Sequence, residues 1–207
     1  MSFFKNTRNL VAAGILGAIG AILMILNINI PSIMPIFIKL DFADLPAVIA
    51  SFAFGPTGGI MVCLIKNFLN LILASNTGGV GELSNFILGC AYVIPAGLIY
   101  KKHHNFKGAI IGALTGSITS ATVGYFSNYF VIYPLFTLTG LSMNTIIGMY
   151  TAVFPNIDTL WEALLYFNVP FTFIKFLLTS ILTFLIYKRI SPILKGKNKK
   201  NNEARES

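Results

Sequence analysis

The chain has 207 residues, of which 55% are hydrophobic and only 11% are charged, and its formal net charge is +8. A soluble globular domain carries roughly twice this share of charged residues, so the composition excludes a soluble fold. The basic residues stand at the ends of apolar segments and in the tail, as in loops that face anionic lipid, so the positive charge does not indicate nucleic-acid binding.

The first apolar segment runs from about Asn9 to Asn27 and is long enough to cross a bilayer as a helix. Two basic residues precede it, as in a signal peptide, but no clean cleavage site follows, so we interpret it as a retained helix. Ala13, Gly17 and Ala21 recur in it at a spacing of four, which lets another helix approach closely. Two alternatives stay open for this stripe: packing against the protein's own helices, or docking to a separate membrane subunit.

Residues 28–43 are expected to form a loop. Its end and the start of the next helix carry the charged stretch Lys39-Leu40-Asp41-Phe42-Ala43-Asp44-Leu45-Pro46. Asp44 is predicted to cap a short helix that ends near Phe54, with Pro46 placed where no amide donor is needed. This helix is too short to span a bilayer by length alone. A polar loop beside a short apolar helix indicates a lid over a binding site.

A third helix is expected from about Pro56 to Ala74. Its polar side chains should face protein or a cavity rather than lipid; they are Lys66, Asn67 and Asn70. A fourth helix is expected from about Glu82 to Tyr100, with Glu82 and Asn85 on one face. Because a carboxylate in the first turn of a helix is favourable in any case, Glu82 alone is weak evidence for a site.

A fifth helix is expected from about Gly108 to Tyr133, with Asn128 on a face of small residues. Residues 134–158 are expected to connect it to the next helix, with a short helix within the connection left open. The sixth helix is expected from about Pro170 to Lys188. Polar side chains at intervals of three and four form one stripe beside and along it: Asn168, Thr172, Lys175, Thr179 and Thr183. A lysine inside a membrane helix is costly and usually functional. The structural alternative for Lys175 is an ion pair, for example with Glu162 or Glu82.

The chain shows no set of residues for metal binding or catalysis. Cys63 and Cys90 lack metal-ligand spacing, and the adjacent His103 and His104 have no third ligand nearby. Motifs of metalloproteases, serine hydrolases and nucleotide-binding P-loops are missing. We therefore predict no metal, no cofactor and no enzymatic activity.

The charge distribution sets the expected topology. With six spans, the basic residues near both termini and those at 101–107 fall on one side, which is cytoplasmic by the positive-inside rule. The polar ends of the fourth, fifth and sixth helices then meet the loop outside, where amides, hydroxyls and a lysine near aromatic rings suit a planar polar ligand. We predict an all-α integral membrane protein with six transmembrane helices and a long external loop between helices 1 and 2. Residues 1–192 are expected to form one domain, and residues 193–207 a basic, disordered cytoplasmic tail.

Six stretches together carry a family resemblance: Lys39-Leu40-Asp41-Phe42-Ala43-Asp44-Leu45-Pro46-Ala47, Gly55-Pro56-x-x-Gly59, Leu64-Ile65-Lys66-Asn67, Gly81-Glu82-Leu83-Ser84-Asn85-Phe86, Asn128-Tyr129-Phe130 and Asn168-Val169-Pro170-Phe171-x-x-x-Lys175. Their order and spacing resemble the substrate-binding S components of energy-coupling factor (ECF) vitamin transporters, and most closely the riboflavin-specific S components. The likeness covers residues 5 to about 192.

This resemblance implies capture of riboflavin outside the bacterial cell membrane, with acceptance of FMN left open. It also implies ATP-driven uptake with a transmembrane coupling protein and two cytoplasmic ATPases. Asn128 and Lys175 are implied to hold the flavin ring, Thr172 stands where a second asparagine is expected, and Asn168 could substitute for it. The expected ligand-binding residues are Leu40, Asp41, Phe42, Asn85, Asn128, Asn168, Thr172 and Lys175. The residues expected to dock the coupling protein are Ala13, Gly17 and Ala21.

Other functions remain open at this stage. An S component could serve thiamine, folate or pantothenate instead of riboflavin. A stand-alone ion-coupled carrier would use Lys175 and Glu82 as titrating groups. An intramembrane enzyme acting on lipid is a third class, for which the sequence offers no nucleophile or metal set.

Overall fold

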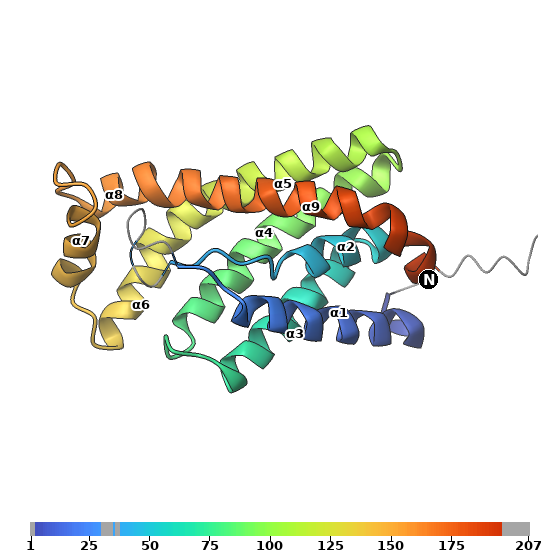
Figure 1. The fold of residues 1–207 in the computed structure, drawn as a ribbon, viewed down its shortest axis with the longest axis horizontal. Helices are drawn as coiled ribbons and strands as arrows, with labels where there is room; N and C mark the ends of the chain where they lie inside the picture. Colours follow the sequence, from blue (N-terminus) through green and yellow to red (C-terminus); the bar gives the residue numbers. More distant parts are fainter. Residues whose placement is uncertain (1–2, 30–34, 36–37, 196–207) are drawn as a thin grey trace, which may run out of the picture.

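The computed structural model describes residues 3–29, 35 and 38–195, and all regular elements in these ranges are helical (Figure 1). The α-helices are α1 (Thr7–Ile25), α2 (Leu45–Phe54), α3 (Pro56–Leu73), α4 (Val80–Lys102), α5 (Phe106–Ser127), α6 (Tyr133–Leu138), α7 (Met143–Thr151), α8 (Leu160–Ala163) and α9 (Val169–Lys195). The short 3-10 helix η1 (Phe3–Lys5) precedes them, and two π-helical turns, η2 (Asn128–Ile132) and η3 (Leu164–Asn168), lie between α-helices. Ile28 and Leu40 form an isolated antiparallel bridge.

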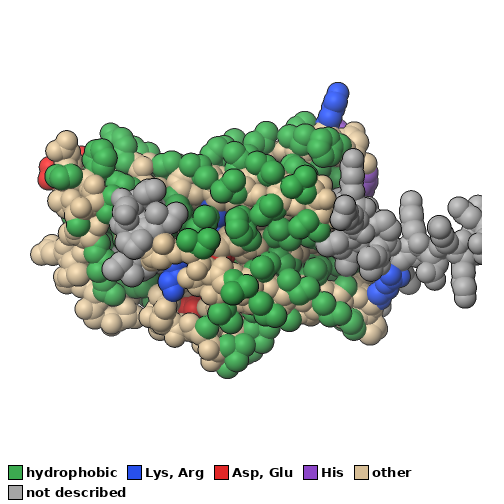
Figure 2. All heavy atoms as spheres, viewed as in Figure 1, with side chains coloured by type: hydrophobic (Ala, Val, Ile, Leu, Met, Phe, Trp, Pro, Cys, Tyr) green, Lys and Arg blue, Asp and Glu red, His purple; other side chains and the backbone are tan. Residues whose placement is uncertain are grey.

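Five helical stretches of the described chain are long and apolar enough to cross a membrane: Thr7–Ile25, Pro56–Leu73, Val80–Lys102, Phe106–Leu138 and Leu160–Ile186. Hydrophobic side chains are spread along the bundle on the face shown in Figure 2, and few charged side chains lie among them. On α1, for example, Val11, Ile15 and Ile22 are all exposed. A soluble protein would place polar side chains on such faces, so the surface fits a lipid environment.

The second of the six predicted spans is represented by the short helix α2. Its ten residues rise about 15 Å, roughly half the thickness of a hydrocarbon core. Pro46 to Phe52 are all buried, and the Ser51 hydroxyl donates to the Val93 carbonyl oxygen of α4 at 2.7 Å. α2 is therefore an interior helix, and by length and composition five stretches rather than six qualify as spans.

Two boundaries near prolines differ from the sequence prediction. The fifth helix continues past Tyr133 through η2 into α6, and the last helical stretch starts at Leu160 rather than at Pro170. Pro134 and Pro170 each follow a π-helical turn. A proline lacks the amide that a helix needs and its ring crowds the carbonyl one turn before, so a locally wider turn lets the helix continue. The predicted breaks at these positions were wrong for this reason.

The stripe of small residues on α1 faces inward. Ala13, Gly17 and Ala21 are all buried. A Cβ atom added to Gly17 would lie 2.7 Å from the Cβ atom of Ile65 in α3, which is too close for any real pair. In this structure the stripe is not a free surface. The geometry therefore supports packing within the protein, and the docking role of these residues stays a prediction.

The last helix is longer than predicted. α9 extends to Lys195, beyond the expected end at Lys188. The remainder of the predicted tail, residues 196–207, lies outside the described residues. The division of the chain at residue 192 stays a prediction.

Candidate functional site

A cavity of about 320 Å³ lies at one end of the bundle, among the ends of α1 and α3, the starts of α4 and α9, and η2. This volume falls within the range of roughly 300–1,000 Å³ that is usual for small-molecule sites. Six of the eight predicted ligand-binding residues line it: Asp41, Asn85, Asn128, Asn168, Thr172 and Lys175. Leu40 and Phe42 are not among the lining residues. Part of the predicted lid, residues 30–34 and 36–37, lies outside the described residues.

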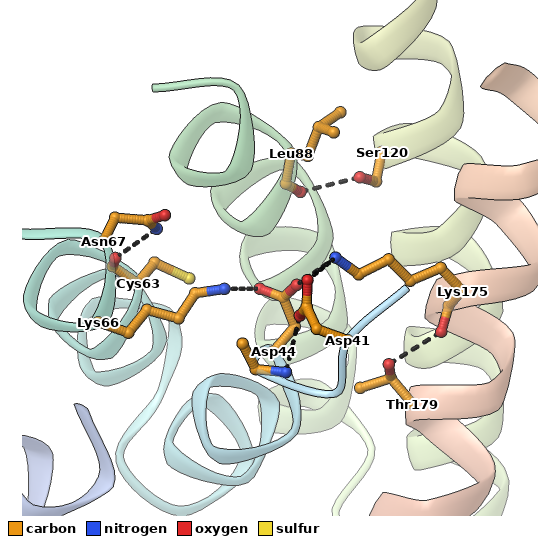
Figure 3. A network of polar contacts seen from close by, with 10 residues as sticks. Asp41, Asp44, Cys63, Lys66, Asn67, Leu88, Ser120, Lys175 and Thr179 are labelled. Carbon is orange, nitrogen blue, oxygen red and sulfur yellow. Dashed lines mark hydrogen bonds and ion pairs between the residues drawn. The ribbon is translucent and has the colours of Figure 1, made fainter. Parts of the chain in front are cut away.

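Four buried charged side chains meet beside the cavity (Figure 3). The ammonium Nζ of Lys175 donates to Asp41 Oδ2 at 3.0 Å and lies 3.8 Å from Asp44 Oδ2. Lys66 Nζ donates to Asp44 Oδ1 at 2.8 Å. Two positive and two negative charges thus neutralise one another, which is a condition for burying them. Lys175 does form an ion pair, but the partners suggested from sequence, Glu162 and Glu82, were wrong.

The predicted helix cap at Asp44 was also wrong. Asp44 precedes α2, yet its side chain makes no capping hydrogen bond. Its carboxylate points instead to the ammonium groups of Lys66 and Lys175, because a buried carboxylate gains more from two cations than from one amide donor. The turn before α2 is held by Asp41, whose Oδ1 accepts the Ala43 amide hydrogen at 2.9 Å.

Asn128 and Asn168 both lie in π-helical turns and both line the cavity, but their amides differ in availability. Asn168 accepts from the Tyr150 hydroxyl at 2.7 Å and donates to the Tyr133 hydroxyl at 2.9 Å, and the two tyrosine hydroxyls also contact each other. Asn128 has one long hydrogen bond, from the Ser84 hydroxyl at 3.4 Å. Asn168 is therefore held in a protein network, whereas the Asn128 amide has hydrogen-bonding capacity left for a ligand.

Burial keeps the network around Asn168 neutral. Tyr150 lies in α7, and its burial raises the pKa of its hydroxyl well above the ordinary value. The raised pKa extends the pH range over which the hydroxyl stays protonated and donates to Asn168.

Four aromatic side chains line the cavity. Tyr133 and Phe136 belong to α6, and Phe171 and Phe176 belong to α9. Flat rings together with amides and a lysine suit a planar heterocycle with polar edges. Sequence reasoning named the lysine and the amides but not these rings, since aromatic residues are spread along the whole chain and only the fold selects four of them.

Polar residues beyond the eight predicted ligand-binding residues also line the cavity. They include Asn27, Asn70, Asn76, Thr77, Glu82 and Ser84. Asn70 and Glu82 stood out in sequence as polar groups in or beside apolar helices, which was the signal available for them. Asn27 and Asn76 follow α1 and α3, where polar residues at a helix end give no such signal.

Within the described residues no group of three or more His, Cys, Asp or Glu side chains could hold a metal ion. An apolar helical bundle with several candidate spans and a polar cavity at one end defines a membrane protein that binds a small molecule. Comparison with known families makes this class specific. The family described as ECF transporter, substrate-specific component, matches residues 8–187, and the chain belongs to this family. It is thus a multi-pass cell membrane protein, a substrate-binding transporter component and not an enzyme.

Curated relatives cover most of the chain. The riboflavin transporter RibU of Staphylococcus aureus (strain TCH60) is 31% identical over 191 residues, which span 92% of this chain and 94% of the relative. The riboflavin transporter FmnP of Bacillus subtilis (strain 168) is 31% identical over 191 residues, or 90% of this chain and 94% of the relative. A solved structure, described as the S component of a bacterial ECF transporter, superposes with a TM-score of 0.71 at 31% identity and covers 91% of this chain and 98% of its own.

Proposed function

We propose that the protein binds riboflavin from the extracellular side and delivers it for ATP-driven uptake, together with a transmembrane coupling protein and two cytoplasmic ATPases. The observation that carries the proposal is the cavity, which Asn128 and Lys175 line together with four aromatic rings. The names of the two relatives, both riboflavin transporters, support this choice of vitamin.

The ion pair prepares Lys175 for a ligand. An ammonium group has three N–H donors. Asp41 accepts one at 3.0 Å, whereas Asp44 lies at 3.8 Å, which is an ion-pair distance and too long for a hydrogen bond. A remaining donor can reach a carbonyl oxygen of the flavin ring, and the bond to Asp41 orients the ammonium group. The Asn128 amide would pair with the mixed donors and acceptors on the ring edge, while the aromatic lining residues stack on its face.

The proposed orientation places both termini in the cytoplasm. Arg8 at the start of α1 and Lys101 at the end of α4 lie together at the end of the bundle opposite the cavity (Figure 1). Basic residues concentrate on the cytoplasmic side of membrane proteins. The cavity then opens to the outside, and the basic end faces the ATPases.

Titration of flavin fluorescence in detergent tests the proposal. We expect the purified protein to quench riboflavin fluorescence with one site per chain. Lys175→Met and Asn128→Ala should each weaken binding by about tenfold or more, because each removes a hydrogen bond to the ring. Lys101→Met, at the opposite end, is the control and should bind as the wild type does.

Asn128→Ala also guards against a folding artefact, since Asn128 makes one long hydrogen bond and its truncation leaves the ion pairs intact. A wild-type protein that leaves riboflavin fluorescence unchanged would reject riboflavin as the ligand. Thiamine, folate and pantothenate would then be titrated in turn by calorimetry.

A further inference from the structure

Another cavity, of about 660 Å³, lies at the opposite end of the bundle (Figure 1). We call it the basic cavity. It is enclosed by η1, the start of α1, the turn from α2 to α3 and the end of α4. Its volume also falls within the range usual for small-molecule sites. The two cavities share no described lining residue, so the basic cavity would take a ligand of its own.

The charged groups of the basic cavity favour an anion. Arg8 and Lys101 line it, His104 adds an imidazole, and no Asp or Glu is among its described lining residues. Pro56 marks the start of α3 at the same cavity, and no side chain caps this helix start, so the helix dipole adds partial positive charge. A guanidinium group presents its donors in a plane that matches the oxygens of a phosphate group.

An exposed apolar face leads away from each of the two cations. On α1, Val11 and Ile15 follow Arg8 by three and seven residues and therefore lie on the same side of the helix. On α4, Leu98 precedes Lys101 by three residues. All three apolar side chains are more than half exposed. A ligand in the cavity can therefore extend over hydrocarbon-like surface on both helices.

We propose that the basic cavity binds the phosphate group of an anionic phospholipid, whose acyl chains lie along the exposed faces of α1 and α4. A soluble phosphate would use the cations but leave the apolar faces uncovered, whereas an amphiphile accounts for both. Tyr100, which also lines the cavity, is a residue type typical of the boundary between headgroups and hydrocarbon. The inference does not depend on which ligand fills the other cavity.

Lipid titration of the full chain in a neutral detergent, followed by native mass spectrometry, tests the site. We expect dioleoylphosphatidylglycerol, which is anionic, to bind at least about fivefold more tightly than dioleoylphosphatidylcholine, which has the same acyl chains and no net charge. Arg8→Gln and Lys101→Gln should each weaken phosphatidylglycerol binding by about fivefold, because each removes a charge-assisted hydrogen bond to the phosphate.

Lys102→Gln is the matched control. Lys102 is the next residue of α4 and is also exposed, but it is not among the residues that line the basic cavity. The substitution changes the net charge by the same amount as Lys101→Gln, so it measures the effect of surface charge alone. We expect it to leave phosphatidylglycerol binding within about twofold of wild type.

Four results would overturn the proposal. Equal binding of the two lipids, or equal losses in Lys101→Gln and Lys102→Gln, would mean that no specific site exists. Competition by inorganic phosphate at the same concentration as the lipid would assign the cavity to a soluble anion. Absence of bound phosphatidylglycerol, together with loss of co-purifying cytoplasmic subunits in Arg8→Gln, would assign it to a protein partner.

Two further measurements keep these results separate from folding and from the proposed function. Thermal unfolding of each variant without lipid checks the fold, and the variants on α1 and α4 provide independent tests. Riboflavin titration of the same samples should give the wild-type affinity, since neither Arg8 nor Lys101 lines the other cavity. Failure of riboflavin binding in the wild type would reject the proposed function and leave the lipid result standing.

Discussion

At the scale of single residues, Asp44 shows how a local pattern can mislead. An aspartate followed by Leu45-Pro46 has the form of a helix cap. The structure gives its carboxylate to Lys66, 22 residues further along, and brings Lys175 close as well. A helix cap stabilises a protein by less than an unpaired buried ammonium group destabilises it. The distant lysines therefore determine where the Asp44 side chain points.

Replacement of Asp44 by asparagine separates the two roles. Asparagine caps helices as well as aspartate does, so a cap would tolerate Asp44→Asn. Loss of the ion pair leaves Lys66 charged, 0% exposed and unmatched, and we expect a loss of about 3–5 kcal/mol in the free energy of unfolding. Thermal unfolding of the ligand-free protein in detergent measures this loss. The control is Asp158→Asn, at an exposed position. If Asp44→Asn were as stable as the wild type, the cap interpretation would be favoured over the ion pair.

At the scale of elements, the contact of α1 with α3 depends on glycine. A side chain at Gly17 would collide with Ile65, whose β-branched side chain has little freedom to move away. Gly14 lies three residues earlier on the same helix, and a Cβ atom added there would have nothing within 4 Å. The spacing of Ala13, Gly17 and Ala21 predicted this close packing correctly, and these three residues do face inward.

The pair Gly17→Ala and Gly14→Ala is therefore a matched test of this packing. We expect Gly17→Ala to lower the free energy of unfolding by about 1–3 kcal/mol through overpacking. Gly14→Ala should leave it unchanged or raise it by up to about 1 kcal/mol, because alanine favours helix. Chemical or thermal unfolding in the same detergent compares them. Equal stability of the two variants would mean that the row at Gly17 is not in close contact with α3.

At the scale of the whole molecule, the cavity and the basic end of α4 lie at opposite ends of the bundle. Lys101 and Lys102 end α4, while the cavity lies at the other end of the same helix, near Glu82. In the proposed orientation, one end of the protein collects the ligand and the other end faces the proposed cytoplasmic subunits. It also makes the orientation measurable at single positions.

Labelling of introduced cysteines with a membrane-impermeant maleimide in whole cells tests the orientation. Leu138→Cys, 81% exposed at the end of α6, should label in intact cells, and exposed Lys102→Cys should label only after permeabilisation. The unmodified chain is the background control, because its Cys63 and Cys90 lie within α3 and α4. The reverse labelling pattern would invert the proposed topology.

The sequence by itself determined the membrane class, the approximate course of most helices and six residues of the cavity. These features depend on apolar runs, helix-breaking residues and rare polar groups inside apolar segments, all of which are local properties of the chain. It missed the continuation through η2 and η3, where a π-helical turn accommodates a proline. That adjustment has no composition signal.

Only the tertiary structure decided which groups meet. Lys175 pairs with Asp41 across 134 residues of sequence, Asn168 is held by two tyrosines while Asn128 stays available, and Glu82 lies in the cavity wall. Such pairings follow from the path of the chain in space, and a buried charge takes the partner that this path places within reach. The sequence therefore names the polar residues of the site, and the fold assigns each one to the protein's own network or to the ligand.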